Sequence, residues 1–228
     1  PRNSDNKYRG MVTLKRALAN SINTVSAKLI DKTGPEAVVE LTHKLGVTSE
    51  IPAQPSIALG AVEITVQDMV AAYSTFANQG VYVKPQFLRE VREFDKTIVP
   101  FKKEVINPQI CSKETILKVK QLLKEVVEKP HGTGHKLYSP NFSMAGKTGT
   151  AQGNYGVNGG ADKHYISSFV GFFPVDKPKY TCIVVVHKPS TINGNFYGAD
   201  VAAPVFKRIA QKIFTDVPST NKFKSIKL

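Results

Sequence analysis

The residues of this chain whose types and spacing best suit chemistry form the tetrapeptide Lys147-Thr148-Gly149-Thr150. Lys147 supplies a fixed positive charge, and two hydroxyls two residues apart point to the same face of a strand. Gly149 removes the side chain between them, so a ligand can approach the backbone closely. The sequence therefore predicts a strand that lines a site for an anionic, peptide-like substrate.

A second candidate motif is Ser21-Ile22-Asn23, which lies inside a predicted helix. Serine and asparagine are poor choices for a helix interior, because their side chains compete for backbone hydrogen bonds. A hydroxyl there can relay a proton, and a carboxamide can hold a substrate carbonyl. Taken alone, each motif is better explained as a solvated helix edge or a plain edge strand. Their joint occurrence in this order favours a site.

The elements that must position these motifs follow from hydrophobic periodicity and from turn residues. A turn is expected at His131-Gly132-Thr133-Gly134, and a loop at 153–163. The link at 174–179 is short enough for a hairpin. Helices are predicted from Thr13 to near Gly34, from Pro35 to Gly46, and over about 65–78, 112–128 and 199–215, with strands near 87–94 and at about 142–152, 165–173 and 180–187.

Length and composition allow a sizeable core, since 41% of the 228 residues are apolar. Consecutive strands with helices before and after them predict an α/β (α+β) fold, in which a largely antiparallel sheet is covered by helices. The helical part is expected over about 11–85 and the sheet part over about 86–216. Residues 217–228 are expected to be a solvated basic tail.

The net charge of +13 suggests an acidic partner. Nucleic acid is not favoured, because the charge is scattered and no nucleic-acid module is recognisable. The positive charge also fits an anionic membrane surface or a cell-wall polymer as the partner. Neither Cys111 and Cys182 nor the five histidines have a metal-binding spacing, and a disulfide between the two cysteines stays open. No apolar run approaches the ~18–20 residues that span a bilayer.

The two motifs together resemble those of the penicillin-recognising serine acyl-transferases, specifically high-molecular-weight penicillin-binding proteins, which carry S-x-x-K, S-x-N and K-T-G in that order. Ser21-Ile22-Asn23 matches the second motif, and Lys147 to Gly149, followed by Thr150, match the third. Residues 11–85 look most like the bifunctional class A enzymes, whereas residues 105–216 are more similar to class B division transpeptidases. The resemblance leaves open whether the chain is a mosaic or a lineage that blends both.

This resemblance implies a role for each site residue. Ser21 would pass a proton to the leaving amine, Asn23 would hold the substrate amide, and Lys147 would sustain the electrostatics around Ser21. Thr148 and Thr150, with Gly149 between them, would bind the terminal carboxylate of a stem peptide or penicillin. The backbone N–H of Thr150 would give half of an oxyanion hole. No cofactor or metal is implied.

One departure from the family pattern concerns the nucleophile. Ser4-Asp5-Asn6-Lys7 spells S-x-x-K, but it is polar and too close to Ser21. The match at Ser219-Thr220-Asn221-Lys222 lies in the tail. We therefore expect the catalytic serine and lysine to be absent from this chain, which begins without a methionine and is expected to be a C-terminal fragment.

The resemblance as a whole implies a peptidoglycan D,D-transpeptidase that cross-links stem peptides ending in D-Ala-D-Ala and is acylated by β-lactams. The implied setting is the periplasmic face of the bacterial inner membrane, with an anchor upstream and with glycosyltransferase and division or elongation proteins as partners. Two alternatives stay open: a D,D-carboxypeptidase or β-lactamase relative, and a catalytically silent module that binds or senses cell-wall peptides.

Overall fold

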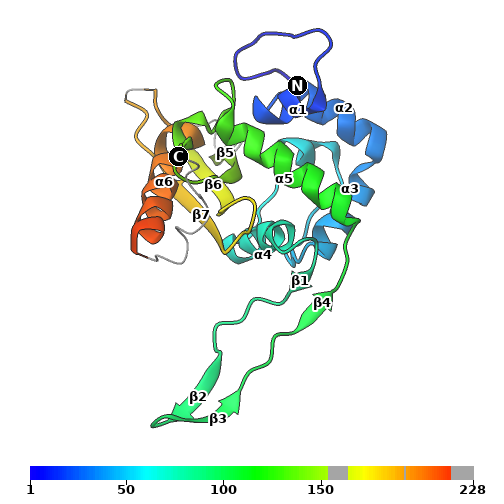
Figure 1. Cartoon of the computed structure of the whole chain (residues 1–228). Coiled ribbons are helices and arrows are strands. Elements are labelled where there is room, and N and C mark those ends of the chain that lie inside the picture. The colour runs from blue at the N-terminus through cyan, green and yellow to red at the C-terminus, as the bar shows by residue number, and fades with distance from the viewer. Residues whose placement is uncertain (154–163, 193, 217–228) are drawn as a thin grey trace.

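The site is built on a three-stranded antiparallel sheet, seen in a computed structural model that describes residues 1–153, 164–192 and 194–216. The strands are β5 (Ala145–Gly153), β6 (His164–Phe173) and β7 (Tyr180–His187), in the order β5-β6-β7. Thr148 pairs with Phe169, and Gly171 pairs with Cys182. Helix α6 (Gly198–Asp216) covers one face, and α5 (Lys113–Glu128) with α4 (Val66–Ala77) covers the other (Figure 1).

The core is formed where these layers meet. Phe169 and Phe173 of β6 pack edge-on against Phe206 of α6, with ring centroids 4.7 and 5.6 Å apart. On the opposite face, Phe172 packs with Ala145 of β5 and Leu123 of α5. Because side chains alternate along a strand, adjacent residues of β5 and β6 serve opposite layers. The sheet is therefore fixed from both sides.

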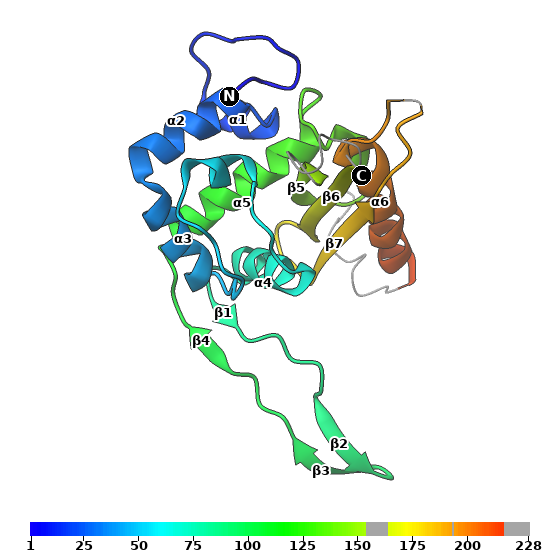
Figure 2. The same ribbon diagram turned by 180° about the vertical axis from the view of Figure 1, so that it is seen from behind.

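The N-terminal side is helical and lies beside α5 (Figure 2). Thr13 and Ser112 cap the starts of α1 and α5: each hydroxyl accepts the backbone N–H of the residue three positions ahead. The elements on this side are α1 (Leu14–Ala19), α2 (Asn23–Thr33), α3 (Pro35–Lys44), the 3-10 helix η1 (Pro55–Leu59) and α4.

The prediction of one continuous helix from Thr13 to near Gly34 is wrong. The helix ends at Ala19, and α2 begins at Asn23. Asn20 caps the end of α1, because its side-chain amide donates to the carbonyl of Arg16 at 3.0 Å. Periodicity missed this break because Leu18, Ile22 and Val25 keep helical spacing across it.

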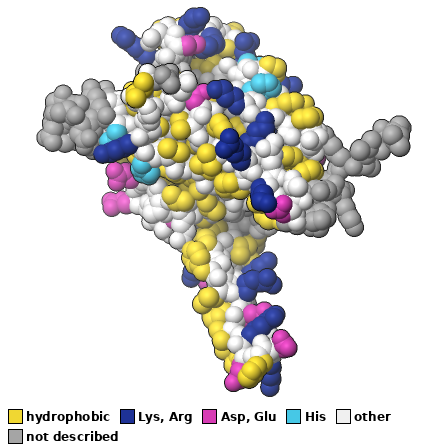
Figure 3. Space-filling model, turned by 90° about the vertical axis from the view of Figure 1, so that its left-hand side faces the viewer, with side chains coloured by type: hydrophobic (Ala, Val, Ile, Leu, Met, Phe, Trp, Pro, Cys, Tyr) yellow, Lys and Arg dark blue, Asp and Glu magenta, His cyan; other side chains and the backbone are white. Residues whose placement is uncertain are grey.

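The region near 87–94 differs from its prediction of a single strand. Strands β2 (Glu90–Glu93) and β3 (Lys96–Pro100) form a hairpin, joined to the body by β1 (Tyr82–Val83) and β4 (Val105–Asn107). This arm projects away from the helices and the sheet (Figures 1 and 2). Hydrophobic side chains lie along it among charged ones (Figure 3). Phe94 at its tip is almost fully exposed.

The expected fold class is confirmed: the chain is mixed α/β, with antiparallel sheets and covering helices. The three strands of the main sheet, the hairpin link at 174–179 and the helices at 112–128 and 199–215 lie where they were predicted. Cys111 and Cys182 are both free thiols. No helix in the described ranges is long and apolar enough to cross a membrane. Most of the predicted loop at 153–163 and the predicted basic tail lie outside the described residues.

The contact of Phe206 with the sheet generates a stability prediction. We expect Phe206→Ala to lower the free energy of unfolding by about 3–5 kcal/mol, since the ring is fully buried between two phenylalanines. Val205→Ala, at an exposed position of the same helix, is the matched control and should cost no more than about 0.5 kcal/mol. Urea unfolding of both variants measures the difference. Equal costs would contradict the assigned core.

Candidate active site

Ser21 lies in the tight turn between α1 and α2. Its φ of 53° is in the left-handed region, which is unfavourable for a residue with a Cβ. Ile22 anchors the turn: its side chain is buried, and its N–H donates to the carbonyl of Ala17 at 2.9 Å. A strained residue held by its neighbours is a frequent feature of functional sites. The turn leaves the Ser21 side chain exposed and able to reach a partner outside its own helices.

That partner is Lys147 of β5. Its Nζ donates to Ser21 Oγ at 2.9 Å and to the carbonyl oxygen of Thr148 at 3.0 Å. Residues 126 positions apart in the sequence thus meet in the fold. Helix α1 is held on α5 by an ion pair of 2.8 Å between Lys15 and Glu125, and β5 packs on the same helix. Helix α5 is therefore the common support of both motifs.

The environment of Lys147 changes its acidity. Its side chain keeps some contact with solvent, but protein atoms surround most of it. Burial lowers the pKa of Lys147 to about 8, because a charge is less stable away from water. At neutral pH the group is still an ammonium ion, and it donates to Ser21 Oγ. Its hydrogen bond occupies a lone pair of that oxygen, so the hydroxyl hydrogen of Ser21 is left to be donated elsewhere.

Strand β5 lies at the edge of its sheet, so one row of its backbone groups takes no part in strand pairing. Alternation places Thr148 and Thr150 on the face of β5 toward α6, as their spacing predicted, and Lys147 on the face toward α5. The hydroxyl of Thr150 accepts the N–H of Gly198, the first residue of α6, at 3.0 Å. The threonines and the lysine therefore reach the same edge from opposite faces.

Packing inside the protein also requires glycine at position 149, in addition to the predicted approach of a ligand. A methyl group there would overlap the hydroxyl oxygen of Ser168 on β6. On the other face, a methyl group at Gly198 would overlap the carbonyl oxygens of Gly149 and Ser168. Both glycines thus permit close approach within the protein. Approach of a ligand to the backbone at Gly149 stays a prediction.

A residue that the sequence analysis placed only in a turn belongs to the site. Thr133 Oγ1 lies 2.8 Å from Thr148 Oγ1, and Lys147 Nζ lies 3.4 Å from the same Thr148 oxygen. The predicted turn at 131–134 is confirmed, and it brings Thr133 to the edge of β5. A threonine flanked by two glycines was the signal available in the sequence, since such glycines often mark close backbone packing.

Asn23 faces a different group from the one predicted for it. It is the first residue of α2, and its side-chain amide donates to the carbonyl of Arg2 at 2.9 Å. The structure brings Ser21 and Lys147 together, with Thr148 beside them, but it does not place Asn23 in that cluster. The amide has a second N–H and an oxygen, so a role in holding a substrate stays a prediction.

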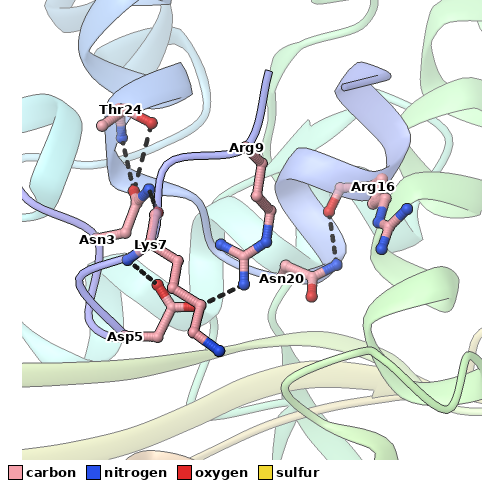
Figure 4. Close-up of polar contacts among 7 residues, drawn as sticks. All are labelled: Asn3, Asp5, Lys7, Arg9, Arg16, Asn20 and Thr24. Atoms are coloured by element: carbon pink, nitrogen blue, oxygen red, sulfur yellow. Dashed lines mark hydrogen bonds and ion pairs between the residues drawn. The ribbon is translucent and has the colours of Figure 1, made fainter. Parts of the chain in front are cut away.

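The N-terminal segment that spells S-x-x-K does not form a helix. Asn3 accepts the backbone N–H of Thr24 at 3.1 Å and so caps the start of α2, while Asp5 accepts the N–H of Lys7 and pairs with Arg9 (Figure 4). Ser4 lies in an exposed turn. The motif at Ser219 lies outside the described residues.

Other parts of the described chain offer no competing metal centre. Among residues 1–153, 164–192 and 194–216, no three histidine, cysteine, aspartate or glutamate side chains group closely enough to hold an ion. The groups that the site itself presents are an ammonium ion, hydroxyls and backbone groups along a strand edge. This set suits proton relay and the binding of an anionic group.

Comparison with known proteins gives matches over most of the chain. A family model described as the penicillin binding protein transpeptidase domain matches residues 2–211. Penicillin-binding protein 1A of Aquifex aeolicus is 36% identical over 174 residues, which are 76% of this chain and 22% of that protein. The peptidoglycan D,D-transpeptidase FtsI of Buchnera aphidicola is 38% identical over 112 residues, covering 49% and 19% of the two chains.

The chain spans well under half the length of these relatives. The probable peptidoglycan D,D-transpeptidase PbpC of Pseudomonas aeruginosa is 29% identical over 222 residues, and the match covers 88% of this chain and 37% of that one. The relatives include both a penicillin-binding protein 1A and an FtsI, and the sequence of this chain resembled two classes of the family. The assignment of one class to residues 11–85 and another to 105–216 stays a prediction.

Solved structures agree on the fold. The transpeptidase domain of penicillin-binding protein 3 from Burkholderia pseudomallei superposes with a TM-score of 0.74 at 23% identity, covering 94% of this chain and 67% of that one. Penicillin-binding protein 2B of Streptococcus pneumoniae gives a TM-score of 0.73 at 19% identity, covering 91% and 40%. At these identities the similarity supports the fold alone, and the assignment of the site depends on the geometry described above.

The acidity of Lys147 generates a prediction about pH and stability. Below about pH 8 the lysine is charged in both the folded and the unfolded chain, and burial of that charge lowers stability. Between about pH 8 and 10.5 the folded chain has lost a proton that the unfolded chain keeps. The contribution of Lys147 to the free energy of unfolding should therefore rise with pH in this window, by up to about 1.4 kcal/mol per pH unit.

The measurement compares urea unfolding of the wild-type chain with that of Lys147→Met from pH 7 to 10.5. Subtraction of the two curves removes the titration of every other group. We expect the free energy of unfolding of the wild type to rise relative to that of Lys147→Met as the pH rises. A difference that stays constant up to pH 10 would show that Lys147 titrates like an exposed lysine.

Proposed function

We propose, from the premise that this chain belongs to the penicillin-binding protein transpeptidase family, that it forms part of a peptidoglycan D,D-transpeptidase. Family membership rests on the match over residues 2–211. In the proposed reaction, a serine attacks the carbonyl of the penultimate D-alanine of a stem peptide. The C–N bond to the terminal D-alanine then breaks, an acyl-enzyme forms, and an amine of a second stem peptide accepts the acyl group.

The observation that carries this proposal is the hydrogen bond from Lys147 Nζ to Ser21 Oγ, at 2.9 Å. It places an ammonium ion and an exposed hydroxyl beside a strand edge that carries two further hydroxyls. Departure of an amine requires a proton, and Ser21 is the group that we assign to deliver it. Lys147 replaces that proton more readily than an ordinary lysine, because burial has lowered its pKa to about 8.

The substrate-binding residues in this proposal are Thr148, Gly149 and Thr150. An ammonium ion and two hydroxyls suit a carboxylate, which accepts charge-assisted hydrogen bonds. The terminal carboxylate of D-Ala-D-Ala and the carboxylate of a penicillin are the ligands of that chemistry. The backbone N–H of Thr150, on an edge strand, is assigned as one donor of the oxyanion hole. Asn23 is assigned to the substrate amide.

The nucleophile in this proposal is supplied from outside these 228 residues. Support comes from the S-x-x-K at Ser4, which lies in an exposed turn and whose Asp5 and Lys7 bond to each other. A nucleophilic serine needs an adjacent base that is held in place, and a turn with mixed local bonds does not offer one. A membrane anchor upstream, a periplasmic position and partners that extend or divide the wall belong to the same proposal.

Two alternatives use the same residues differently. A D,D-carboxypeptidase or β-lactamase relative would transfer the acyl group to water, and a silent module would bind cell-wall peptides without acylation. The acyl acceptor, water in place of an amine, distinguishes the carboxypeptidase or β-lactamase relative from a transpeptidase. The absence of acylation distinguishes the silent module. The similarity of the chain to the peptidoglycan D,D-transpeptidase FtsI and to the probable transpeptidase PbpC favours the transpeptidase.

A fluorescent penicillin tests the proposed function. We expect covalent labelling of the natural polypeptide that carries this chain with its upstream sequence, and none of residues 1–228 alone. Lys147→Met should slow labelling by roughly 10²–10³-fold, the usual effect of removing a group that stabilises developing charge. Lys118→Met, which removes an exposed lysine from α5, is the charge-matched control and should label normally.

Three outcomes would contradict parts of this proposal. Labelling of residues 1–228 alone would place the nucleophile inside the chain. Absence of labelling in the natural polypeptide would favour the silent module. Release of the free acid instead of a cross-linked product, when an amine acceptor is present, would favour the carboxypeptidase.

A further inference from the structure

The turn at 131–134 is seated directly on the end of α5. The N–H of Gly134 donates to the carbonyl of Val126 at 2.9 Å. A methyl group at Gly132 would overlap that same carbonyl oxygen, so only glycine fits there. Thr133, between the two glycines, is therefore held by backbone packing on the helix that also supports α1 and β5.

Thr133 connects both halves of the site. Its N–H donates to the carbonyl of Ala19 at 2.9 Å. Ala19 is the last residue of α1, is fully buried and stands two positions before Ser21. The Thr133 hydroxyl oxygen lies 2.8 Å from that of Thr148 on β5. One residue thus bonds to the end of the helix that presents Ser21 and to the strand that presents Lys147.

These contacts close into a ring. Thr148 Oγ1 lies within reach of Thr133 and of Lys147 Nζ, and Nζ donates in turn to Ser21 Oγ. The chain then returns from Ser21 through Asn20 to Ala19, whose carbonyl accepts from Thr133. A closed ring restrains each hydroxyl more than a single bond would, because moving one member strains the others.

We propose that Thr133 is a positioning residue of this site, which orients the Thr148 hydroxyl toward the carboxylate of the ligand and fixes the distance between Ser21 and Lys147. The inference rests on the proposed function for the nature of the ligand. Thr148 Oγ1 has two lone pairs, and in the proposed arrangement Lys147 Nζ donates to one and the Thr133 hydroxyl is assigned to donate to the other. The hydrogen of Thr148 is then left to point along the open strand edge, where an anion gains a donor.

The first test needs no activity and uses the 228-residue chain. The pKa of Lys147 is followed by NMR of its Nζ group in the wild type, Thr133→Ser, Thr133→Val, Thr148→Val and the double valine variant. Removal of an acceptor that stabilises the ammonium ion lowers a lysine pKa. We expect Thr133→Val and Thr148→Val each to lower the midpoint by roughly half a pH unit, and the double variant to equal Thr148→Val.

Thr133→Ser keeps the hydroxyl and should match the wild type. Thr97→Val, which removes an exposed hydroxyl from the arm, is the control for the substitution itself and should leave the midpoint unchanged. A midpoint in Thr133→Val that equals that of the wild type would overturn the inference. Additive shifts in the double variant would overturn it as well, because Thr133 would then act without Thr148.

The second test measures the acylation rate constant for benzylpenicillin in the natural polypeptide. We expect about a tenfold loss for Thr133→Val, a change within about twofold for Thr133→Ser, and no further loss when Thr133→Val is added to Thr148→Val. The methyl ester of the penicillin, which lacks the carboxylate, should show little effect of Thr133→Val. An equal loss with acid and ester would overturn the assigned orientation. A wild type that is not acylated contradicts the proposed function, while the Lys147 titration still decides the role of Thr133.

Discussion

The hydrogen bond between Lys147 and Ser21 is the interaction on which the site depends. It joins an edge strand to a turn between two helices, across 126 residues of sequence. Neither partner can reach the other unless α1 and β5 both lie on α5, as they do. Helix α5 is amphipathic and capped at its start by Ser112, so the local sequence makes a rigid support for elements that are distant along the chain.

Close backbone packing sets the precision of this arrangement. Gly198 brings the start of α6 against Gly149 and Ser168, and Gly132 brings the turn against Val126. Each contact removes a layer of side chains that would otherwise separate the elements. Hydroxyls at such joints, those of Thr133 and Thr150, are thereby brought into direct hydrogen bonds. The geometry of the site follows from contacts of backbone with backbone, which tolerate little adjustment.

The electrostatics of the site are local. The chain carries a net charge of +13, but this says little about the site, because exposed charges are screened by water and salt. Protein atoms surround most of the Lys147 side chain, and this burial lowers its pKa to about 8. A group with this pKa holds its proton at neutral pH, yet its pKa is close enough to neutrality for the proton to be transferred during a reaction. The lowered pKa of Lys147 therefore comes from the folded protein around it and cannot be read from the residues next to it in the sequence.

The sequence by itself determined the helices and strands that local patterns specify, among them α5, α6 and the three strands of the main sheet, together with the fold class and the family of the chain. It also singled out Ser21, because serine is a poor choice for a helix interior, and Lys147, because its charge stands beside two hydroxyls spaced along a strand. Tertiary structure decided what local rules do not contain: the break at Asn20, the hairpin arm, the partner of Asn23 and the entry of Thr133 into the site. Periodicity reports which residues share a face of one element, whereas these features depend on which elements meet and on how closely their backbones approach.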